Sequence, residues 1–150
     1  MNKYLKIAKD IFIPLAVGGI VGLIIMPFMD YETLVKPPLA PPGWVFPVIW
    51  GILYTLMGVS FTIADRSSLD DGDKLLYYFQ LGVNALWPIA FFVLKWRLFA
   101  FIWILFLAVL VYLMIKMFYK YSALSAYLQI PYLIWVLFAS YLNLGIYLLN

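Results

Sequence analysis

The chain has 150 residues, of which 67% are hydrophobic and 11% are charged, and its formal net charge is +3 at pH 7. Soluble domains carry roughly 25% charged residues, so this composition excludes a soluble globular protein and predicts an integral membrane protein. The chain has no cysteine and no histidine, which excludes metal sites and catalytic triads that depend on those side chains. We expect no cofactor, no bound metal and no nucleic-acid partner.

Five apolar segments follow one another along the chain. Each is close to the ~20 residues that a helix needs to cross a hydrocarbon core of ~30 Å. None alternates between apolar and polar residues as the wall of a β-barrel does. The sequence therefore predicts an all-α bundle of five transmembrane helices in a single membrane domain, residues 1–150, with helices at approximately 7–29, 43–65, 75–95, 97–119 and 122–149.

Basic residues are unevenly distributed over the connections between these helices. If successive connections alternate sides, seven Lys and Arg residues share the side of the N-terminus and three share the other side. Cytoplasmic loops carry the excess of Lys and Arg, so we predict a cytoplasmic N-terminus. The seven are Lys3, Lys6, Lys9, Arg66, Lys74, Lys116 and Lys120, and the three are Lys36, Lys95 and Arg97.

All seven acidic residues are expected at helix ends or in loops. Pumps and proton-coupled transporters usually keep an ionisable side chain at membrane depth, so this distribution argues against charge-coupled transport. It leaves open a passive path for a neutral or amphiphilic molecule. Aromatic rings are then the main side chains available to contact such a molecule. The seven are Asp10, Asp30, Glu32, Asp65, Asp70, Asp71 and Asp73.

The connection between the first two helices, 30–43, is long and rich in proline. Its second half, from Lys36 to Gly43, holds four prolines in eight residues. Links between neighbouring helices usually take two to eight residues, and proline favours extended, pre-ordered backbone. We interpret this segment as a lid that covers part of the bundle, and not only as a connection.

Aromatic and amide side chains from four helices reach one level of the membrane. At ~1.5 Å per residue, they lie between about 9 and 16 Å below the outer end of the bundle. They either form a binding pocket or pack the helices together, and both interpretations remain open, because stripes at helical spacing usually indicate packing. An interfacial belt is the simpler interpretation for Trp44, Trp96 and Trp103, nearer the outer ends. The residues at the common level are Trp50, Asn84, Trp87, Ile104 and Trp135.

Three stretches resemble the tryptophan-rich sensory protein family, the bacterial relatives of the mitochondrial translocator protein, once called the peripheral benzodiazepine receptor. They are DYETLVKPPLAPPGWVFPVIWGILYTLMGVS at 30–60, GVNALWPIAFF at 82–92 and IPYLIWVLFASYLN at 130–143. The resemblance covers essentially the whole chain. It implies a five-helix bundle in a bacterial cell membrane, often a homodimer, whose cavity beneath the first loop accepts porphyrins and isoquinoline- or benzodiazepine-like ligands.

The resemblance also implies a ligand-binding site. It places this site on the first loop and on four helices. Ile104 would supply the wall from the fourth helix. The full set is Tyr31, Pro41, Pro42, Trp50, Tyr54, Asn84, Trp87, Ile104, Trp135 and Ala139.

This sequence departs from the family pattern at three positions. Asp30 and Leu39 stand where the family usually has tryptophan, which would thin the aromatic lid. Trp103 stands where many relatives have an acid, and it would either narrow the cavity or lie on a dimer face.

Three hypotheses about function follow. The first is a membrane receptor or carrier for tetrapyrroles, with Asn84 as hydrogen-bond donor and a sensory or transport role. The second is light-dependent porphyrin degradation with Trp50 and Trp135 as redox-active rings, as the resemblance implies for some relatives. The third is a structural or regulatory partner of other membrane proteins, with Gly18 and Gly22 at a helix contact.

Overall fold

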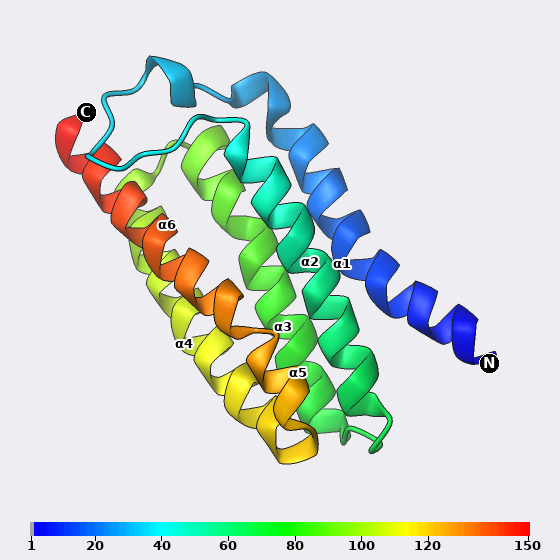
Figure 1. The fold of residues 1–150 in the computed structure, drawn as a ribbon. Coiled ribbons are helices and arrows are strands. Elements are labelled where there is room, and N and C mark those ends of the chain that lie inside the picture. Colours follow the sequence, from blue (N-terminus) through cyan, green and yellow to red (C-terminus); the bar gives the residue numbers. More distant parts are fainter. Residues whose placement is uncertain (1) are drawn as a thin grey trace.

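The computed structural model of the chain describes residues 2–150. In that range the chain is an all-α integral membrane protein with no β-strand and with five helices long and apolar enough to cross a membrane. A short helix and three single-turn segments complete it, and Figure 1 shows how the elements are arranged. The elements are α1 (Lys3–Ile25), η1 (Met26–Phe28), η2 (Tyr31–Thr33), α2 (Val45–Asp65), α3 (Asp71–Pro88), η3 (Ile89–Val93), α4 (Arg97–Tyr121), α5 (Ala123–Tyr127) and α6 (Ile130–Leu149).

Two helices begin about one turn earlier than their apolar runs predict. The first starts at Lys3 and not near residue 7, because the Asn2 side chain accepts a hydrogen bond from the Tyr4 amide (2.7 Å). The third starts at Asp71 and not at residue 75, because Asp70 caps it through the Asp73 amide (2.9 Å). A polar cap satisfies amides that have no partner within the helix, so these helices continue beyond their apolar runs.

The predicted last helix, 122–149, is divided into two. Its first part, α5, ends at Tyr127, and α6 begins at Ile130 with Pro131 in its first turn. Proline has no amide hydrogen, and its ring clashes with the carbonyl four residues earlier, which here belongs to Tyr127. At the break the buried Gln129 amide donates to the Ser60 hydroxyl (2.8 Å) of α2. The break therefore turns a polar side chain into the bundle.

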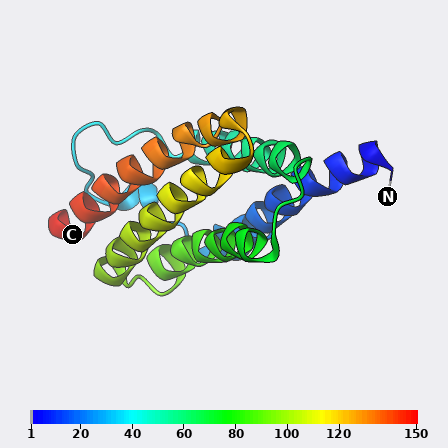
Figure 2. The same cartoon turned by 90° about the horizontal axis from the view of Figure 1, so that it is seen from below.

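The bundle has two ends with different connections. The long loop after α1, the connection 94–96 and the C-terminus lie at one end, which we call the lid end (Figure 1). The loop 66–70 lies at the other, which we call the N-terminal end. The first turns of α1 project beyond the other helices in both views (Figures 1 and 2). Loop 29–44, between η1 and α2, is called the lid from here on.

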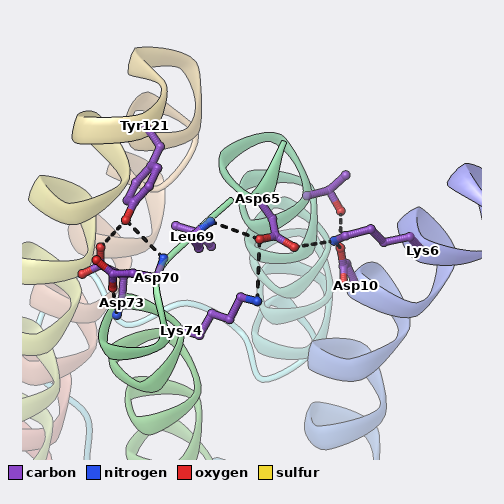
Figure 3. A network of polar contacts seen from close by, with 9 residues as sticks. Lys6, Asp10, Asp65, Leu69, Asp70, Asp73, Lys74 and Tyr121 are labelled. Carbon is purple, nitrogen blue, oxygen red and sulfur yellow. Dashed lines mark hydrogen bonds and ion pairs between the residues drawn. The ribbon is translucent and has the colours of Figure 1, made fainter. Parts of the chain in front are cut away.

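A polar network ties α1 to α2 at the N-terminal end (Figure 3). Asp10 lies inside α1 and is 4% exposed, so it is not at the helix end where the sequence places it. Its carboxylate accepts hydrogen bonds from Lys6 (2.6 Å) and from Thr62 of α2 (2.9 Å). Lys6 also pairs with Asp65 (2.9 Å). A buried carboxylate is tolerated when it is paired and hydrogen-bonded, and this one anchors α1.

Candidate functional site

A cavity of about 570 Å³ opens inside the lid end. Its walls come from α1, α2, α3 and α6, from η1 and η3, and from Met29 and Tyr31 of the lid. Nearly all of these side chains are apolar or aromatic. Pockets for drug-sized molecules typically measure ~300–1,000 Å³ and combine apolar walls with a few polar groups, so this cavity has the dimensions and chemistry of a ligand site.

Trp50 forms the wall on α2. Its ring stacks on Tyr54 at a centroid distance of 5.6 Å and meets the edge of Tyr132 at 6.3 Å. Both contacts lie in the range that favours aromatic pairs. Trp50 lines the cavity, and within residues 2–150 its indole nitrogen donates no hydrogen bond. Trp50 thus presents a ring face and a free donor.

A chain of buried hydrogen bonds lies next to Trp50. The Tyr54 hydroxyl donates to the Asn84 side-chain oxygen (2.6 Å), and the Asn84 amide nitrogen donates to the Tyr132 hydroxyl (2.7 Å). Tyr132 donates in turn to Gln80 (2.8 Å), whose amide contacts the sulfur of Met57 (3.3 Å). Because buried polar groups are costly unless paired, this chain holds α2, α3 and α6 in one relative position.

Trp87 forms the wall on α3. Its indole nitrogen donates to the Asn143 side chain of α6 (3.0 Å), and Asn143 donates to the Arg97 carbonyl (2.8 Å). After Pro88 the helix widens into the single π turn of η3, and such turns often occur at functional sites. Phe91 of that turn also lines the cavity and lies 5.4 Å from Trp87.

Tyr31 closes the cavity from the lid. It is 4% exposed, and its ring meets the edge of Phe46 at 5.0 Å. Its hydroxyl donates to the Pro41 carbonyl (2.6 Å) across the lid, and the Lys36 ammonium lies 4.8 Å from the ring centroid. Burial, and to a lesser extent the negative charge of Glu32, raises the pKa of the Tyr31 hydroxyl above its usual value of 10.0. Tyr31 is therefore neutral over the physiological pH range.

An ion pair fastens the beginning of the lid to α4. Both side-chain oxygens of Asp30 accept from the Arg97 guanidinium, at 2.7 and 2.9 Å. The Arg97 side chain is 13% exposed, and its guanidinium lies 5.0 Å from the Phe91 ring centroid. Lys95 adds a second, more exposed pair with Asp30 at 3.6 Å. Since buried and hydrogen-bonded pairs are screened less than surface pairs, the Arg97 pair is the stronger attachment.

The middle of the lid is attached to α6. The side chain of Asn150 bonds both backbone groups of Val35, accepting from its amide (3.1 Å) and donating to its carbonyl (2.8 Å). Three residues further along the lid, the Tyr141 hydroxyl donates to the Pro38 carbonyl (2.7 Å). These bonds satisfy backbone groups that proline-rich, extended chain leaves without partners.

Six of the ten residues in the predicted site line the cavity, and four do not. Ile104 is fully buried in the packing of α4, and Pro41 and Pro42 lie in the lid outside the lining. Trp135 lies behind Phe46, with ring centroids 5.7 Å apart, and its buried indole nitrogen has no partner within residues 2–150. The six that line the cavity are Tyr31, Trp50, Tyr54, Asn84, Trp87 and Ala139.

The three departures from the family pattern have separate structural outcomes. Asp30 supplies the ion pair to Arg97 that attaches the lid. Leu39 is 83% exposed and lies outside the cavity lining, with a backbone φ of 72°. Trp103 also lies outside the lining and donates to the Val83 carbonyl of α3 (2.8 Å), so it does not narrow the cavity.

Sequence reasoning missed two groups of lining residues. One is the face of α1 that carries Gly18, Gly19 and Gly22. The sequence signal for this face is the spacing of Gly18 and Gly22, which by itself predicts a contact between helices. The other includes Phe46, one turn before Trp50, and Asn143, a polar residue on an otherwise apolar helix. An amide in a membrane helix is a reason to look for a partner, and here the partner is Trp87.

Comparison with known proteins places the chain in a family. The sequence pattern of the TspO/MBR family matches residues 11–149. The tryptophan-rich protein TspO of Archaeoglobus fulgidus is 42% identical over 80% of this chain and 79% of its own length. Protein CrtK of Rhodobacter capsulatus is 32% identical over 93% and 89%, and the translocator protein of Homo sapiens is 32% identical over 75% and 70%. The chain belongs to the TspO/MBR family.

Proposed function

We propose that the cavity binds flat aromatic molecules, with porphyrins and other tetrapyrroles as the leading class. The observation that carries this proposal is the pair of tryptophans from two different helices, Trp50 of α2 and Trp87 of α3, that line an apolar cavity of about 570 Å³. A ring system held between them gains stacking as well as burial of apolar surface, which is worth ~25 cal/mol per Å². Isoquinoline- and benzodiazepine-like molecules share these features and belong to the same proposal.

The hydrogen bond to the ligand comes from Trp50. The sequence predicts this role for Asn84, whose side-chain oxygen accepts from Tyr54 and whose amide nitrogen already donates one of its two hydrogens to Tyr132. The indole nitrogen of Trp50 has no such bond within residues 2–150, and Trp50 is one of the lining residues. A carbonyl or ring nitrogen of the ligand would accept from it. A ligand without an acceptor would leave the indole donor buried and unpaired, which costs free energy, so such a ligand should bind more weakly.

A sensory or transport role in the membrane agrees with the names of the relatives. They include a tryptophan-rich sensory protein of Cereibacter sphaeroides and translocator proteins of mammals. The chain is a multi-pass membrane protein, so its cavity is suited to a molecule that dissolves in or crosses the bilayer. The proposed orientation has the N-terminus in the cytoplasm and the lid end outside, and the proposed assembly is a homodimer.

Quenching of tryptophan fluorescence by protoporphyrin IX in nanodiscs tests the binding proposal. We expect saturable quenching, with affinity about tenfold weaker in Trp50→Phe, since a hydrogen bond and part of a stacking surface are lost. Trp44→Phe is the matched control, because Trp44 is 69% exposed and lies outside the cavity. Equal affinities of both variants and the wild type would contradict the site, and absence of saturable quenching would contradict the function.

Light-dependent degradation of the bound porphyrin is the second candidate. It assigns redox roles to Trp50 and Trp135. Of these two rings only Trp50 lines the cavity, while Trp135 is separated from it by Phe46 at a centroid distance of 5.7 Å. A new product spectrum that requires both protein and light would support degradation, and its loss in Trp50→Phe would assign the ring. Bleaching at the rate of free porphyrin would leave binding alone.

A further inference from the structure

The helices α1 and α2 touch closely at two levels. At Gly58 a side chain would overlap the backbone of Asp10 and Ile11, so the two helix backbones are in direct contact there. At Gly18 a side chain would overlap the Tyr54 ring. Together with the ion pairs of Asp10 and Lys6, these contacts hold the N-terminal half of α1 against the bundle. The cavity begins at about the level of Gly18, with Leu15 as its first lining residue on α1.

Beyond Gly18, three glycines of the cavity wall face open space. They are Gly19 and Gly22 on α1 and Gly51 on α2, and a Cβ atom at any of them would meet no atom within 4 Å. Glycine destabilises a helix interior by ~1 kcal/mol relative to alanine. Here no close contact of the protein requires the absence of a side chain, unlike at Gly18 and Gly58. The absent side chains leave a gap between the two helices.

A second observation shows where this gap leads. A shallower hollow on the outer face of α2 shares Pro47 and Gly51 with the main cavity. Its other walls include Val48 and Ile52, which are 52% and 55% exposed and lie on the face of α2 turned away from the bundle. On α1, Leu23 lines the cavity and is 68% exposed. The cavity therefore reaches the apolar surface that contacts lipid.

The lid side, in contrast, is attached at several separate points. Asp30 is paired with Arg97, Val35 is bonded to Asn150, and Tyr31 covers the cavity from above. Opening this side requires breaking a partly buried ion pair and several hydrogen bonds together. Opening the gap between α1 and α2 beyond Gly18 breaks no hydrogen bond or ion pair found in residues 2–150.

We propose that ligands reach the cavity sideways from the bilayer, through a portal between α1 and α2 formed by Gly19, Gly22 and Gly51. This inference rests on the proposed binding function and adds the route and the kind of molecule. The molecule is one that partitions into the hydrocarbon region before it binds, such as a flat apolar ring with its polar groups at the lid end. In this arrangement the lid stays closed while ligands enter and leave. The width of the gap between α1 and α2 then determines which molecules reach the cavity.

Side chains added at the portal test the route. In Gly19→Leu and Gly51→Leu we expect association and dissociation of protoporphyrin IX, measured in phosphatidylcholine vesicles, to slow together by about tenfold, with a smaller change in Kd, because a narrowed gate slows both directions. Gly82→Leu is the matched control, an exposed glycine of α3 that also has no atom within 4 Å and lies outside the cavity. Asp30→Asn loosens the lid and should leave both rates unchanged.

The opposite pattern would overturn the portal. Faster association in Asp30→Asn, with unchanged rates in the two portal variants, would mean that ligands pass the lid. A change in Kd of a portal variant with no parallel slowing of dissociation would mean that the glycines are only part of the wall, and it would also count against the portal.

A measurement without ligand separates this inference from the binding proposal. The chain has no cysteine, so a nitroxide attached to Gly51→Cys is the only label. We expect it to collide with lipid-dissolved oxygen as often as a label at Gly82→Cys does, and to be shielded from a water-soluble nickel complex. Accessibility to nickel equal to that of a label at Leu39→Cys, at the exposed lid tip, would show an opening to water and overturn the portal. If protoporphyrin IX does not bind at all, the proposed binding function is contradicted. The accessibility of the label at position 51 still shows whether the portal opens to lipid or to water.

Discussion

The ring of Tyr54 lies directly against Gly18, so that a Cβ atom at position 18 would overlap the Cε2 and Cδ2 atoms of the ring. The same ring stacks on Trp50 at 5.6 Å, and its hydroxyl donates to Asn84. One glycine on α1 therefore sets the position of a tyrosine that connects the cavity wall to the buried hydrogen bonds.

Gly18→Ala should destabilise the protein and weaken ligand binding. The added methyl group displaces the Tyr54 ring, and overpacking of this kind costs ~1–3 kcal/mol. Thermal unfolding in detergent, followed with and without protoporphyrin IX, measures both effects. Gly19→Ala is the control, because a Cβ at position 19 meets no atom within 4 Å. Equal unfolding temperatures for the two variants would contradict the contact.

Tyr54→Phe should cost ~1–3 kcal/mol of stability, because the buried Asn84 oxygen loses its donor. The change keeps the ring and its stacking on Trp50, so any loss of binding should be small compared with that in Trp50→Phe. Denaturant titration in mixed micelles measures the difference in free energy of unfolding. Tyr119→Phe, at a tyrosine 59% exposed, provides the reference and should be neutral. A neutral Tyr54→Phe would mean that Asn84 finds another donor.

Asp30→Asn should loosen the lid while the bundle stays folded. Removal of one partner leaves the Arg97 guanidinium, which is 13% exposed, without its carboxylate. Breaking a pair of this kind costs more than the ~0–1 kcal/mol typical of surface pairs. Hydrogen exchange of the lid amides should accelerate, and exchange in α2 and α3 should not change. Asp71→Asn, at an exposed acid in the first turn of α3, is the control. Uniform acceleration in both variants would exclude a specific attachment.

Tyr31 should make the stability of the lid depend on alkaline pH. Its folded-state pKa is raised above the usual value of 10.0, so the neutral phenol is favoured by folding. Its stabilisation is complete below the unfolded pKa and is lost as the pH rises through that value toward the folded pKa. The advantage of the wild type over Tyr31→Phe, about 1 kcal/mol for one hydrogen bond, should be constant from pH 7 to 9 and shrink above about pH 10. A constant difference up to pH 11 would contradict the Tyr31 bond to Pro41.

Much of the architecture follows from local features of the chain. Apolar runs long enough to span a membrane predicted all five spanning segments, because lipid leaves backbone groups no partner except those within the helix. Helix ends were less certain, since caps such as Asn2 and Asp70 extend helices beyond their apolar runs. The break before Pro131 had a visible signal in the sequence, and reading the last segment as continuous was wrong.

Composition and the lengths of the apolar runs were enough to predict the membrane class. The count of residues along each helix was enough to bring Trp50, Asn84 and Trp87 to one level, because the rise per residue depends only on the helix, and all three line the same cavity. Which predicted side chains line the cavity depends on how the helices are rotated against one another, and this cannot be counted from the sequence. Adjacent residues on a helix point about 100° apart, so a small rotation of α4 or α6 puts Ile104 or Trp135 behind the wall. The same contacts between helices place the Asn84 side chain between Tyr54 and Tyr132, since its hydrogen-bond partners come from other helices.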